Sequence, residues 1–176
     1  VDIFKQEKEI ILSDYNQIQI IVETSTYTTV PSALFIPAES DYYFHFEHAA
    51  DKEKIVLFNR IPACDIINIF SLPLTINKAL ALQFPETTIE HHITYFLKER
   101  IKERRDSIHV WVGKTSVDIV VYKDNRINLI NNYAVTGNED IIYFILFLAE
   151  TFRFDTESAQ FILYQDNNRK ELYDLL

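Results

Sequence analysis

Gly113-Lys114-Thr115 has the residue types that end a nucleotide-binding P-loop. In such a loop, backbone amides and the lysine surround the phosphates, and the hydroxyl group binds the magnesium ion. The motif also requires a glycine five residues before the first of these, and Ile108 stands at that position. The chain contains only 2 Gly, which argues further against a glycine-rich phosphate loop. The pattern therefore does not predict a P-loop.

Two histidine-containing segments could supply metal ligands. His91 and His92 are adjacent, so they point to different faces, and no Cys or further His lies at a metal-site spacing. We expect both to be surface histidines at the start of a helix. His45, Glu47 and His48 form the densest polar cluster, and two of the three would share a face in either a strand or a helix. We favour a solvated loop over a bound transition metal, so no metal site is predicted.

Three other features have both a structural and a functional interpretation. Cys64 lies in an apolar context without a cationic or His neighbour in sequence, so we expect a buried, inert thiol. Residues 98–105 are locally basic but also contain acids, which favours a solvated helix face over an RNA-binding patch. Trp111 is a candidate partner-binding residue, because Trp is favoured in binding hot spots, but we slightly favour a place in the core.

The composition excludes several classes of protein. Hydrophobic residues make up 48% of the 176 residues and aromatic residues 14%, enough for a sizeable core, so disorder is not expected. The net charge of -9 opposes binding to nucleic acid or to an anionic membrane. One cysteine excludes an internal disulfide, and no apolar run is long enough to span a bilayer. We expect a cytoplasmic protein whose start at Val1 is processed or truncated.

The elements that would position these residues follow from hydrophobic periodicity. Alternating apolar residues predict strands at 108–112, 117–122 and 127–130. Asp124-Asn125 separates the last two, and because Asn tolerates positive φ, a hairpin and hence an antiparallel meander are expected. Thr136-Gly137-Asn138-Glu139 fits a capping box, which predicts a helix start. The helix after it is apolar on almost every side over 141–152, so we expect it to be buried against the meander and not to lie on the surface.

The remainder of the chain also alternates between helices and strands. Helices are expected at 4–16, 32–35, 38–44, 74–84, 93–105 and 167–176, and strands at 17–22, 27–30, 55–59, 65–70, 88–90 and 160–165. The apolar run 66–82 is read as core. This alternation predicts α/β layers and not a helical bundle.

The order of a hairpin with a small loop at its mouth, then a strand and a Gly-capped helix, resembles the second half of an actin-like ATPase domain. The segments Tyr27–Phe35, Tyr42–Phe46 and Tyr143–Phe147 are similar to an uncharacterised bacterial family placed among the actin-like proteins. The resemblance implies an α/β fold in which mixed sheets are flanked by helices, as in the ribonuclease H-like subdomains of actin. It also implies a first subdomain at 1–106, lacking its N-terminal hairpin, and a second at 107–176.

In actin-like ATPases, the loop at the hairpin mouth carries Asp-x-Gly followed by small hydroxyl residues, which hold phosphate and magnesium. The matching residues are Trp111-Val112-Gly113, with Ser116 and Asp118 further on. An indole cannot coordinate magnesium, which needs oxygen ligands. The resemblance thus makes Gly113, Ser116, Asp118 and Gly137 the candidates for cofactor binding. Asp118 alternates outward from its strand, so we expect it to make bonds within the hairpin or loop.

Three functions remain open from the sequence. The leading hypothesis is a non-catalytic actin-like module that binds another protein or forms a homodimer, with no cofactor and no catalytic residue. Its groove between subdomains would then be a protein or peptide site. The alternative is an actin-like protein that binds or hydrolyses ATP with magnesium, using ligands from the missing hairpin. A nuclease-like relative is the third, but it needs several clustered acids, and only Asp118 lies near the sheet.

Overall fold

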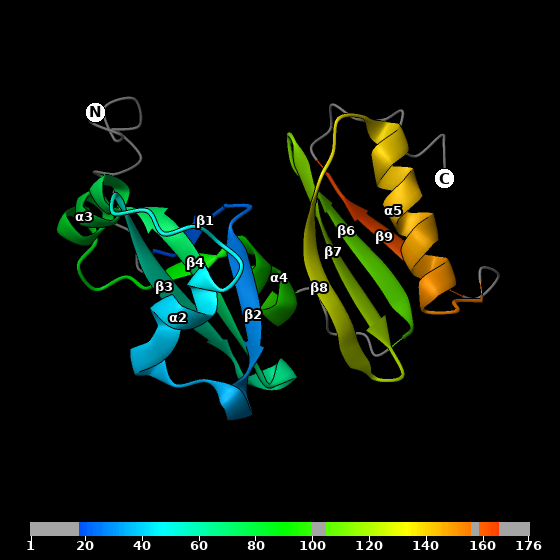
Figure 1. Ribbon diagram of the computed structural model, residues 1–176, viewed down its shortest axis with the longest axis horizontal. Coiled ribbons are helices and arrows are strands. Elements are labelled where there is room, and N and C mark those ends of the chain that lie inside the picture. The colour runs from blue at the N-terminus through cyan, green and yellow to red at the C-terminus, as the bar shows by residue number, and fades with distance from the viewer. Residues whose placement is uncertain (1–17, 100–104, 156–158, 166–176) are drawn as a thin grey trace. The chain divides into compact units, whose positions relative to one another are not determined.

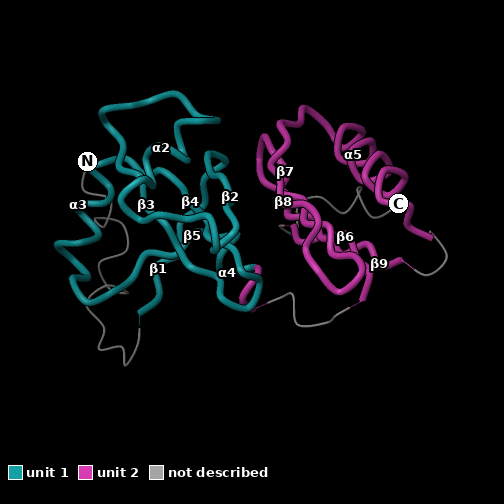
Figure 2. Tube along the Cα trace, turned by 60° about the horizontal axis from the view of Figure 1, so that its bottom comes forward, with its two compact units in different colours: residues 1–96 teal, residues 97–176 magenta. Residues whose placement is uncertain are grey.

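A computed structural model of the chain describes residues 18–99, 105–155 and 159–165. The chain forms two compact units, residues 1–96 and 97–176, and each is described by itself (Figure 2). The helices expected at 4–16 and 167–176 lie outside the described residues. None of the described helices has both the length and the apolar character that a membrane span requires.

Unit 2 is built on a four-stranded sheet with the order β8-β7-β6-β9 (Figure 1). Its elements are β6 (Ser107–Val112), β7 (Ser116–Lys123), β8 (Arg126–Ala134), α5 (Asn138–Thr151) and β9 (Gln160–Tyr164). The first three strands pair antiparallel, which confirms the meander predicted from the alternating residues. After α5, β9 returns to the other side of β6 and pairs with it in parallel.

The turn between β7 and β8 consists of two residues with left-handed backbone conformations. The φ angles of Asp124 and Asn125 are 53° and 63°. Two positive φ angles give the turn a twist that matches the twist of the two strands, and Asp and Asn accept this conformation better than most residues. The Tyr122 hydroxyl also donates a hydrogen bond to Oδ1 of Asn125 at 3.1 Å. The hairpin predicted at Asp124-Asn125 is therefore confirmed.

Helix α5 covers one face of the unit 2 sheet. The core between them contains alternate residues of β6 and β7 together with one side of the helix: Ile108, Val110, Val112, Val117, Ile119, Val121, Ile141, Ile145, Leu148 and Ala149. The opposite side of the helix is exposed, with Tyr143, Leu146 and Phe147 retaining 61%, 56% and 48% of their accessible surface. The helix packs against the meander as predicted. It also lies on the surface, contrary to the prediction, because a single sheet can cover only one side of a helix.

The start of α5 differs from the predicted capping box. The helix begins at Asn138, and the Gly137 before it has no side chain that could cap the free amides. Instead, Asp140 reaches back: its Oδ2 accepts hydrogen bonds from both the amide and the hydroxyl of Thr136, each at 2.7 Å. The acidic partner of Thr136 is therefore Asp140, and not Glu139 as the motif predicted.

Unit 1 contains a three-stranded antiparallel sheet and a pair of short parallel strands. The sheet has the order β2-β4-β3, made of β2 (Tyr27–Pro31), β3 (Lys54–Ile61) and β4 (Ile66–Pro73). The pair consists of β1 (Ile20–Val22) and β5 (Ile89–His91). A turn of 3-10 helix, η3 (Pro62–Cys64), connects β3 to β4, and Asp65 leaves it with a φ of 54°.

Opposite faces of β4 meet different partners. On one side, Ile67 and Ile69 form a core with Phe35 and Phe44, which come from the segment made of η1 (Ser32–Leu34), η2 (Pro37–Glu39) and α2 (Ser40–His45). On the other side, Asn68 bonds to residues of β5 and of α4 (His92–Glu99). This alternation follows from the two-residue period of a strand.

Helix α3 (Leu74–Gln83) is less buried than its sequence predicts. None of its residues is buried, and Leu82 keeps 85% of its accessible surface. The prediction that the apolar run 66–82 belongs to the core is therefore confirmed for β4 but wrong for α3. The helices and strands predicted in unit 1 otherwise occur within a few residues of their expected limits, apart from 100–104 of the last helix, which lies outside the described residues.

Candidate functional site

A short loop joins β6 to β7 at one end of the unit 2 sheet. The Gly113 amide closes it by donating a hydrogen bond of 2.9 Å to the Ser116 carbonyl oxygen. The Val135 amide donates another, of 3.0 Å, to the Thr115 carbonyl oxygen. These bonds hold the loop beside the segment that leads from β8 to Gly137 and α5. Three residues predicted for cofactor binding, Gly113, Ser116 and Gly137, thus come from neighbouring segments.

Carboxylates occupy the beginning of α5. Gly137 is extended, with φ -154° and ψ 179°, a conformation open to any residue. A Cβ atom on Gly137 would lie 2.7 Å from Oε2 of Glu139, so this carboxylate fills the space that the glycine leaves. Asp140 accepts hydrogen bonds from Thr136. The bond from the Thr136 backbone amide, and then the bond from the Thr136 hydroxyl, lower the pKa of Asp140. Two acids in the first turn make this helix start unfavourable for a phosphate group.

Trp111 and Asp118 share the sheet face that points away from α5. They are direct neighbours across β6 and β7, and Tyr164 is the neighbour of Trp111 on β9. The indole stacks on the Tyr164 ring, with centroids 6.2 Å apart and planes inclined by 17°. Trp111 is partly buried and does not belong to the core between sheet and helix.

Asp118 is buried, whereas an outward-facing strand position suggested exposure to solvent. Its Oδ1 accepts a hydrogen bond of 2.8 Å from Nδ2 of Asn132 on the next strand. This bond is of the kind expected for Asp118, since it joins the two strands of a hairpin.

The same face contains a buried chain of polar groups that the sequence reading missed. The Ser107 hydroxyl donates a hydrogen bond to the Arg105 carbonyl oxygen, and Nε2 of His109 lies 3.0 Å from the Ser107 oxygen. Nδ1 of His109 lies 3.1 Å from the Tyr164 hydroxyl. Burial lowers the pKa of His109 to about 4, so its ring is neutral at pH 7. The sequence did contain a signal for these polar groups, because Ser107 and His109 alternate with apolar residues.

Ser107 and His109 have the residue types of a nucleophile and its base, but their surroundings suit a structural role. Both are buried, at 2% and 4% exposure, so a substrate carbonyl group has no access to the hydroxyl. The third partner is a tyrosine hydroxyl and not the carboxylate that orients and stabilises such a base. These hydrogen-bonded side chains link β6 to β9 in addition to the backbone pairing of the two strands.

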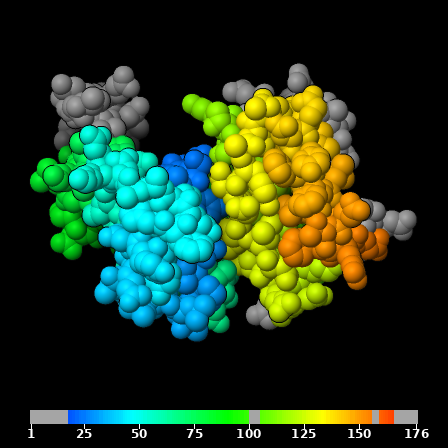
Figure 3. All heavy atoms as spheres, in the orientation of Figure 1, coloured from blue at the N-terminus to red at the C-terminus, as the bar shows by residue number. Residues whose placement is uncertain are grey.

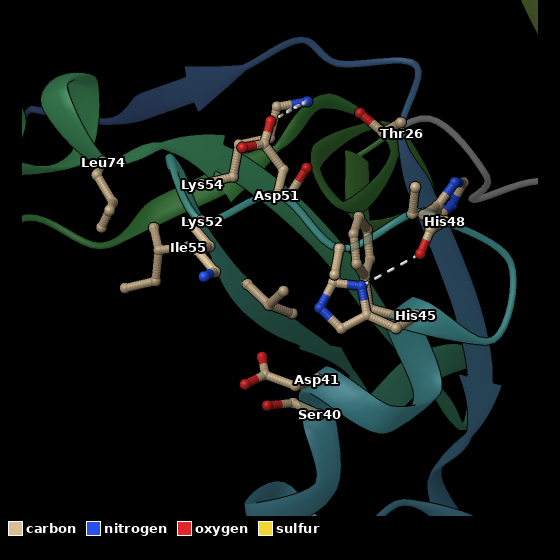
Figure 4. A pocket seen from close by; sticks show the side chains of 15 residues that line it. Thr26, Ser40, Asp41, His45, His48, Asp51, Lys52, Lys54, Ile55 and Leu74 are labelled. Carbon is tan, nitrogen blue, oxygen red and sulfur yellow. Dashed lines mark hydrogen bonds and ion pairs between the residues drawn. The ribbon is translucent and has the colours of Figure 1, made fainter.

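Unit 1 contains an open pocket of about 920 Å³ between α2, the turn before β3, and the sheet (Figure 4). Charged and polar side chains line it, including Asp41, His45, His48, Asp51, Lys52 and Lys54. Nδ1 of His45 donates a hydrogen bond of 3.2 Å to the His48 carbonyl oxygen, and Nε2 of His48 donates one of 3.0 Å to the Tyr27 carbonyl oxygen. The sequence identified this histidine cluster but gave no indication of the pocket.

The residues around these histidines do not assemble a metal site. Across the described ranges, no group of three or more His, Cys, Asp or Glu side chains is placed to hold a metal ion. One nitrogen of each ring already bonds to a backbone carbonyl group.

The other histidine pair, His91 and His92, is buried and not exposed as predicted. Nε2 of His91 donates to the Thr24 carbonyl oxygen at 3.1 Å, and Nδ1 accepts from Nδ2 of Asn68 at 3.0 Å. Burial, and then the neighbouring His92, lower the pKa of His91 to about 3. The prediction failed because β5 ends at His91 and α4 begins at His92, so both side chains enter the interior of unit 1.

Cys64 is half-buried in η3 and not fully buried as expected. Burial and then the neighbouring Asp65 raise the pKa of its thiol. A thiol with a raised pKa is a poor nucleophile, which agrees with the inert role predicted for it.

Comparisons with known proteins identify the fold and the family. No curated protein matches this sequence. Among solved structures, a protein of unknown function from Bacteroides thetaiotaomicron VPI-5482, described as having an actin-like ATPase fold, aligns with a TM-score of 0.82. It is 21% identical, and the alignment covers 98% of this chain and 69% of that one. The actin-like ATPase fold inferred from the sequence is thereby confirmed. A family model described as "Protein of unknown function (DUF3822)" matches residues 1–176, so the chain belongs to this family.

Proposed function

We propose that this chain is a non-catalytic actin-like module that works by binding another protein. The observation that carries the proposal is the exposed apolar stripe on α5, formed by Tyr143, Leu146 and Phe147. These residues are three and four positions apart, so they share one side of the helix. The Tyr143 and Phe147 rings stack with centroids 6.1 Å apart, which joins two of them into one surface.

Covering the stripe would contribute to binding. Figure 3 shows α5, in yellow and orange, forming part of the surface of unit 2. Covering a large apolar side chain contributes about 1.5–3 kcal/mol. Aromatic residues in particular are frequent anchors at the centres of protein interfaces.

The charges beside the stripe favour a partner that is not a second copy of this chain. Exposed Glu139 and Glu150 lie on the same side of α5, before and after the apolar residues. If two copies paired antiparallel through α5, Glu139 of each would approach Glu150 of the other, and like charges oppose such an arrangement. The stripe instead suits a segment with apolar anchors flanked by Lys or Arg.

Two features support the absence of catalysis. Trp111 stands where actin-like ATPases carry the Asp of their phosphate loop, and it stacks on Tyr164 instead of leaving a site for a metal ion. At the neighbouring helix start, Glu139 and Asp140 present negative charge where a phosphate would need positive charge.

Thermal unfolding with and without magnesium-ATP tests this part of the proposal. A ligand that binds only the folded state at one hundred times its Kd stabilises that state by about 2.7 kcal/mol. We expect millimolar magnesium-ATP to leave the unfolding midpoint unchanged. Saturable stabilisation that requires both ATP and magnesium would support the ATP-binding alternative and overturn the proposal.

The variant Leu146→Glu tests the stripe, with Leu82→Glu on exposed α3 as the matched control. Both place a carboxylate at an exposed leucine, so neither should change folding. We expect a protein captured from cell extract by the wild-type chain to bind Leu146→Glu at least about tenfold more weakly, because the loss of one anchor costs more than 1.4 kcal/mol. Binding to Leu82→Glu should be unchanged.

Two measurements on the purified chain and its captured partner complete the test. Isothermal titration should show affinity that falls as salt increases, since the partner's basic groups would face Glu139 and Glu150. Sedimentation of the chain alone should show a monomer at every concentration. A dimer that Leu146→Glu dissociates, or a captured protein that binds both variants equally well, would contradict the assignment of this surface.

A further inference from the structure

The open pocket of unit 1 carries an inference that is independent of α5. Two of its opposite charges form an exposed ion pair, in which Nζ of Lys54 lies 4.0 Å from Oδ2 of Asp51. The other oxygen of Asp51 accepts a hydrogen bond of 2.9 Å from the Glu53 amide. Asp51 and Lys54 are therefore occupied in shaping the turn before β3.

Two further charges, on Asp41 and Lys52, face the same space without being engaged. Within residues 18–99, no hydrogen bond or ion pair joins either side chain to another group. In Figure 4, Asp41 comes from the start of α2 and Lys52 from the turn, and both border the open space beside His45. They do not pair with each other, so a ligand can lie between a carboxylate on one wall and an ammonium group on the other.

The floor of the pocket contains a buried hydroxyl group that lacks a partner. Ser71 is 3% exposed, and the described residues offer its Oγ atom no hydrogen bond. Ser71 follows Ile67 and Ile69 at two-residue intervals on β4, so its side chain lies on the face of the sheet that α2 covers. Such a group costs free energy unless it finds a hydrogen-bond partner. Because the Oγ atom is covered, a ligand in the pocket can reach it only when neighbouring side chains move.

Apolar groups separate the charged walls. Phe44, Ile55, Val56 and Leu74 line the pocket together with Ala49 and Ala50. A polar site with an apolar patch between opposite charges matches a molecule that carries an ammonium group, a carboxylate and an apolar part.

We propose that this pocket binds a short peptide with free termini, with its carboxylate on Lys52 and its ammonium group on Asp41. The apolar part lies against Val56 and Leu74. Ser71 Oγ supplies a hydrogen bond once the side chains that cover it move. The volume of about 920 Å³ admits a peptide of several residues as readily as one amino acid.

The test titrates the full 176-residue chain with L-leucine, L-phenylalanine and trialanine, followed by calorimetry and by NMR signals of His45 and His48. We expect saturable binding of trialanine, with signal changes at these two rings. Lys52→Gln and Asp41→Asn should each weaken it about tenfold, the effect of one charge-assisted hydrogen bond. Lys78→Gln on the exposed side of α3 is the control and should bind as the wild type does.

Blocked forms of the ligand assign each charge to its wall. N-acetylated ligand, which keeps only the carboxylate, should lose sensitivity to Asp41→Asn and keep its sensitivity to Lys52→Gln. Ligand with an amidated carboxyl group should show the reverse pattern. This crossed result separates two specific contacts from a general effect of charge on the surface.

Ser71→Ala gives a second, independent readout. Removing an unsatisfied buried hydroxyl should leave the chain equally or more stable in urea, while the affinity for the probe falls. Absence of saturable binding by trialanine, or affinity unchanged in Lys52→Gln, Asp41→Asn and Ser71→Ala together, would overturn the proposal.

Discussion

At the scale of single residues, the interior of unit 1 fixes the protonation of His91. A carbonyl oxygen can only accept, so the bond to Thr24 requires a proton on Nε2 of His91. Nδ1 accepts from Asn68 and must therefore lack a proton. The rings of Tyr27 and Phe70 surround the imidazole, with both centroids 4.9 Å away. A second proton would remove the bond from Asn68 and leave a charge among aromatic rings.

This arrangement predicts that stability falls in mild acid. The pKa of His91 drops from 6.5 to about 3 on folding, so the unfolded chain binds a proton that the folded chain does not. The stability that His91 contributes is present above pH 6.5 and is lost progressively down to pH 3. The free energy of unfolding attributable to His91 should be about 2 kcal/mol lower at pH 5 than at pH 7.5.

Urea unfolding at the two pH values measures this difference. His91→Gln should be less stable at pH 7.5 but should lose less stability at pH 5 than the wild type does. NMR gives a direct check, because the ring signals of His91 should not titrate between pH 8 and pH 5. Titration of this ring near 6.5 would contradict the buried, neutral state.

At the scale of elements, the start of α5 shows how a motif can identify an element and still assign the wrong bond. The Thr136 motif predicted that a helix begins here, and one does. The acid that bonds to Thr136 is nevertheless Asp140, one residue beyond the acid of the motif. Both acids occur in the first turn, and only the path of the backbone at Gly137 decides which of them reaches Thr136.

The two acids should therefore differ in their effect on unfolding. Asp140→Ala removes two hydrogen bonds at the helix start and should lower the unfolding midpoint more than Glu139→Ala, which removes none of the cap bonds. These bonds lower the pKa of Asp140 in the folded chain. The stability that Asp140 contributes is therefore fully present above its ordinary pKa of 3.8, and it is lost as the pH falls through the lower pKa of the folded state. Equal shifts in the two variants, measured by circular dichroism at pH 7, would sink this assignment.

The strands were easier to predict than the surroundings of their side chains. The alternation in residues 108–112 and 117–122 identified β6 and β7, because one face of each strand is covered by α5 and must be apolar. The same pattern could not reveal that the other face is also largely buried, as Asp118 and His109 are. A polar residue that alternates with apolar residues in a strand is predicted to be exposed. Only the tertiary structure shows that it has a buried partner.

At the scale of the whole molecule, the resemblance to actin-like proteins predicted the right fold, although Trp111-Val112-Gly113 lacks the Asp of the expected Asp-x-Gly pattern. The order of the elements depends on many apolar positions, so it could be recognised without that one residue. The pocket of unit 1 was beyond sequence reasoning, because α2, the 51–54 turn and β4 contribute residues that are distant in the chain. The stripe on α5 was visible in the sequence, but its exposure was not.

The topology of unit 2 also implies an order of assembly. The three strands of the meander follow one another through short connections, so each pairing closes only a small loop of chain. β9 pairs with β6 across the whole meander and α5, and closing so large a loop costs more conformational entropy. We therefore expect the hairpins to form first in unit 2 and β9 to join last, once α5 has brought the chain back along the sheet.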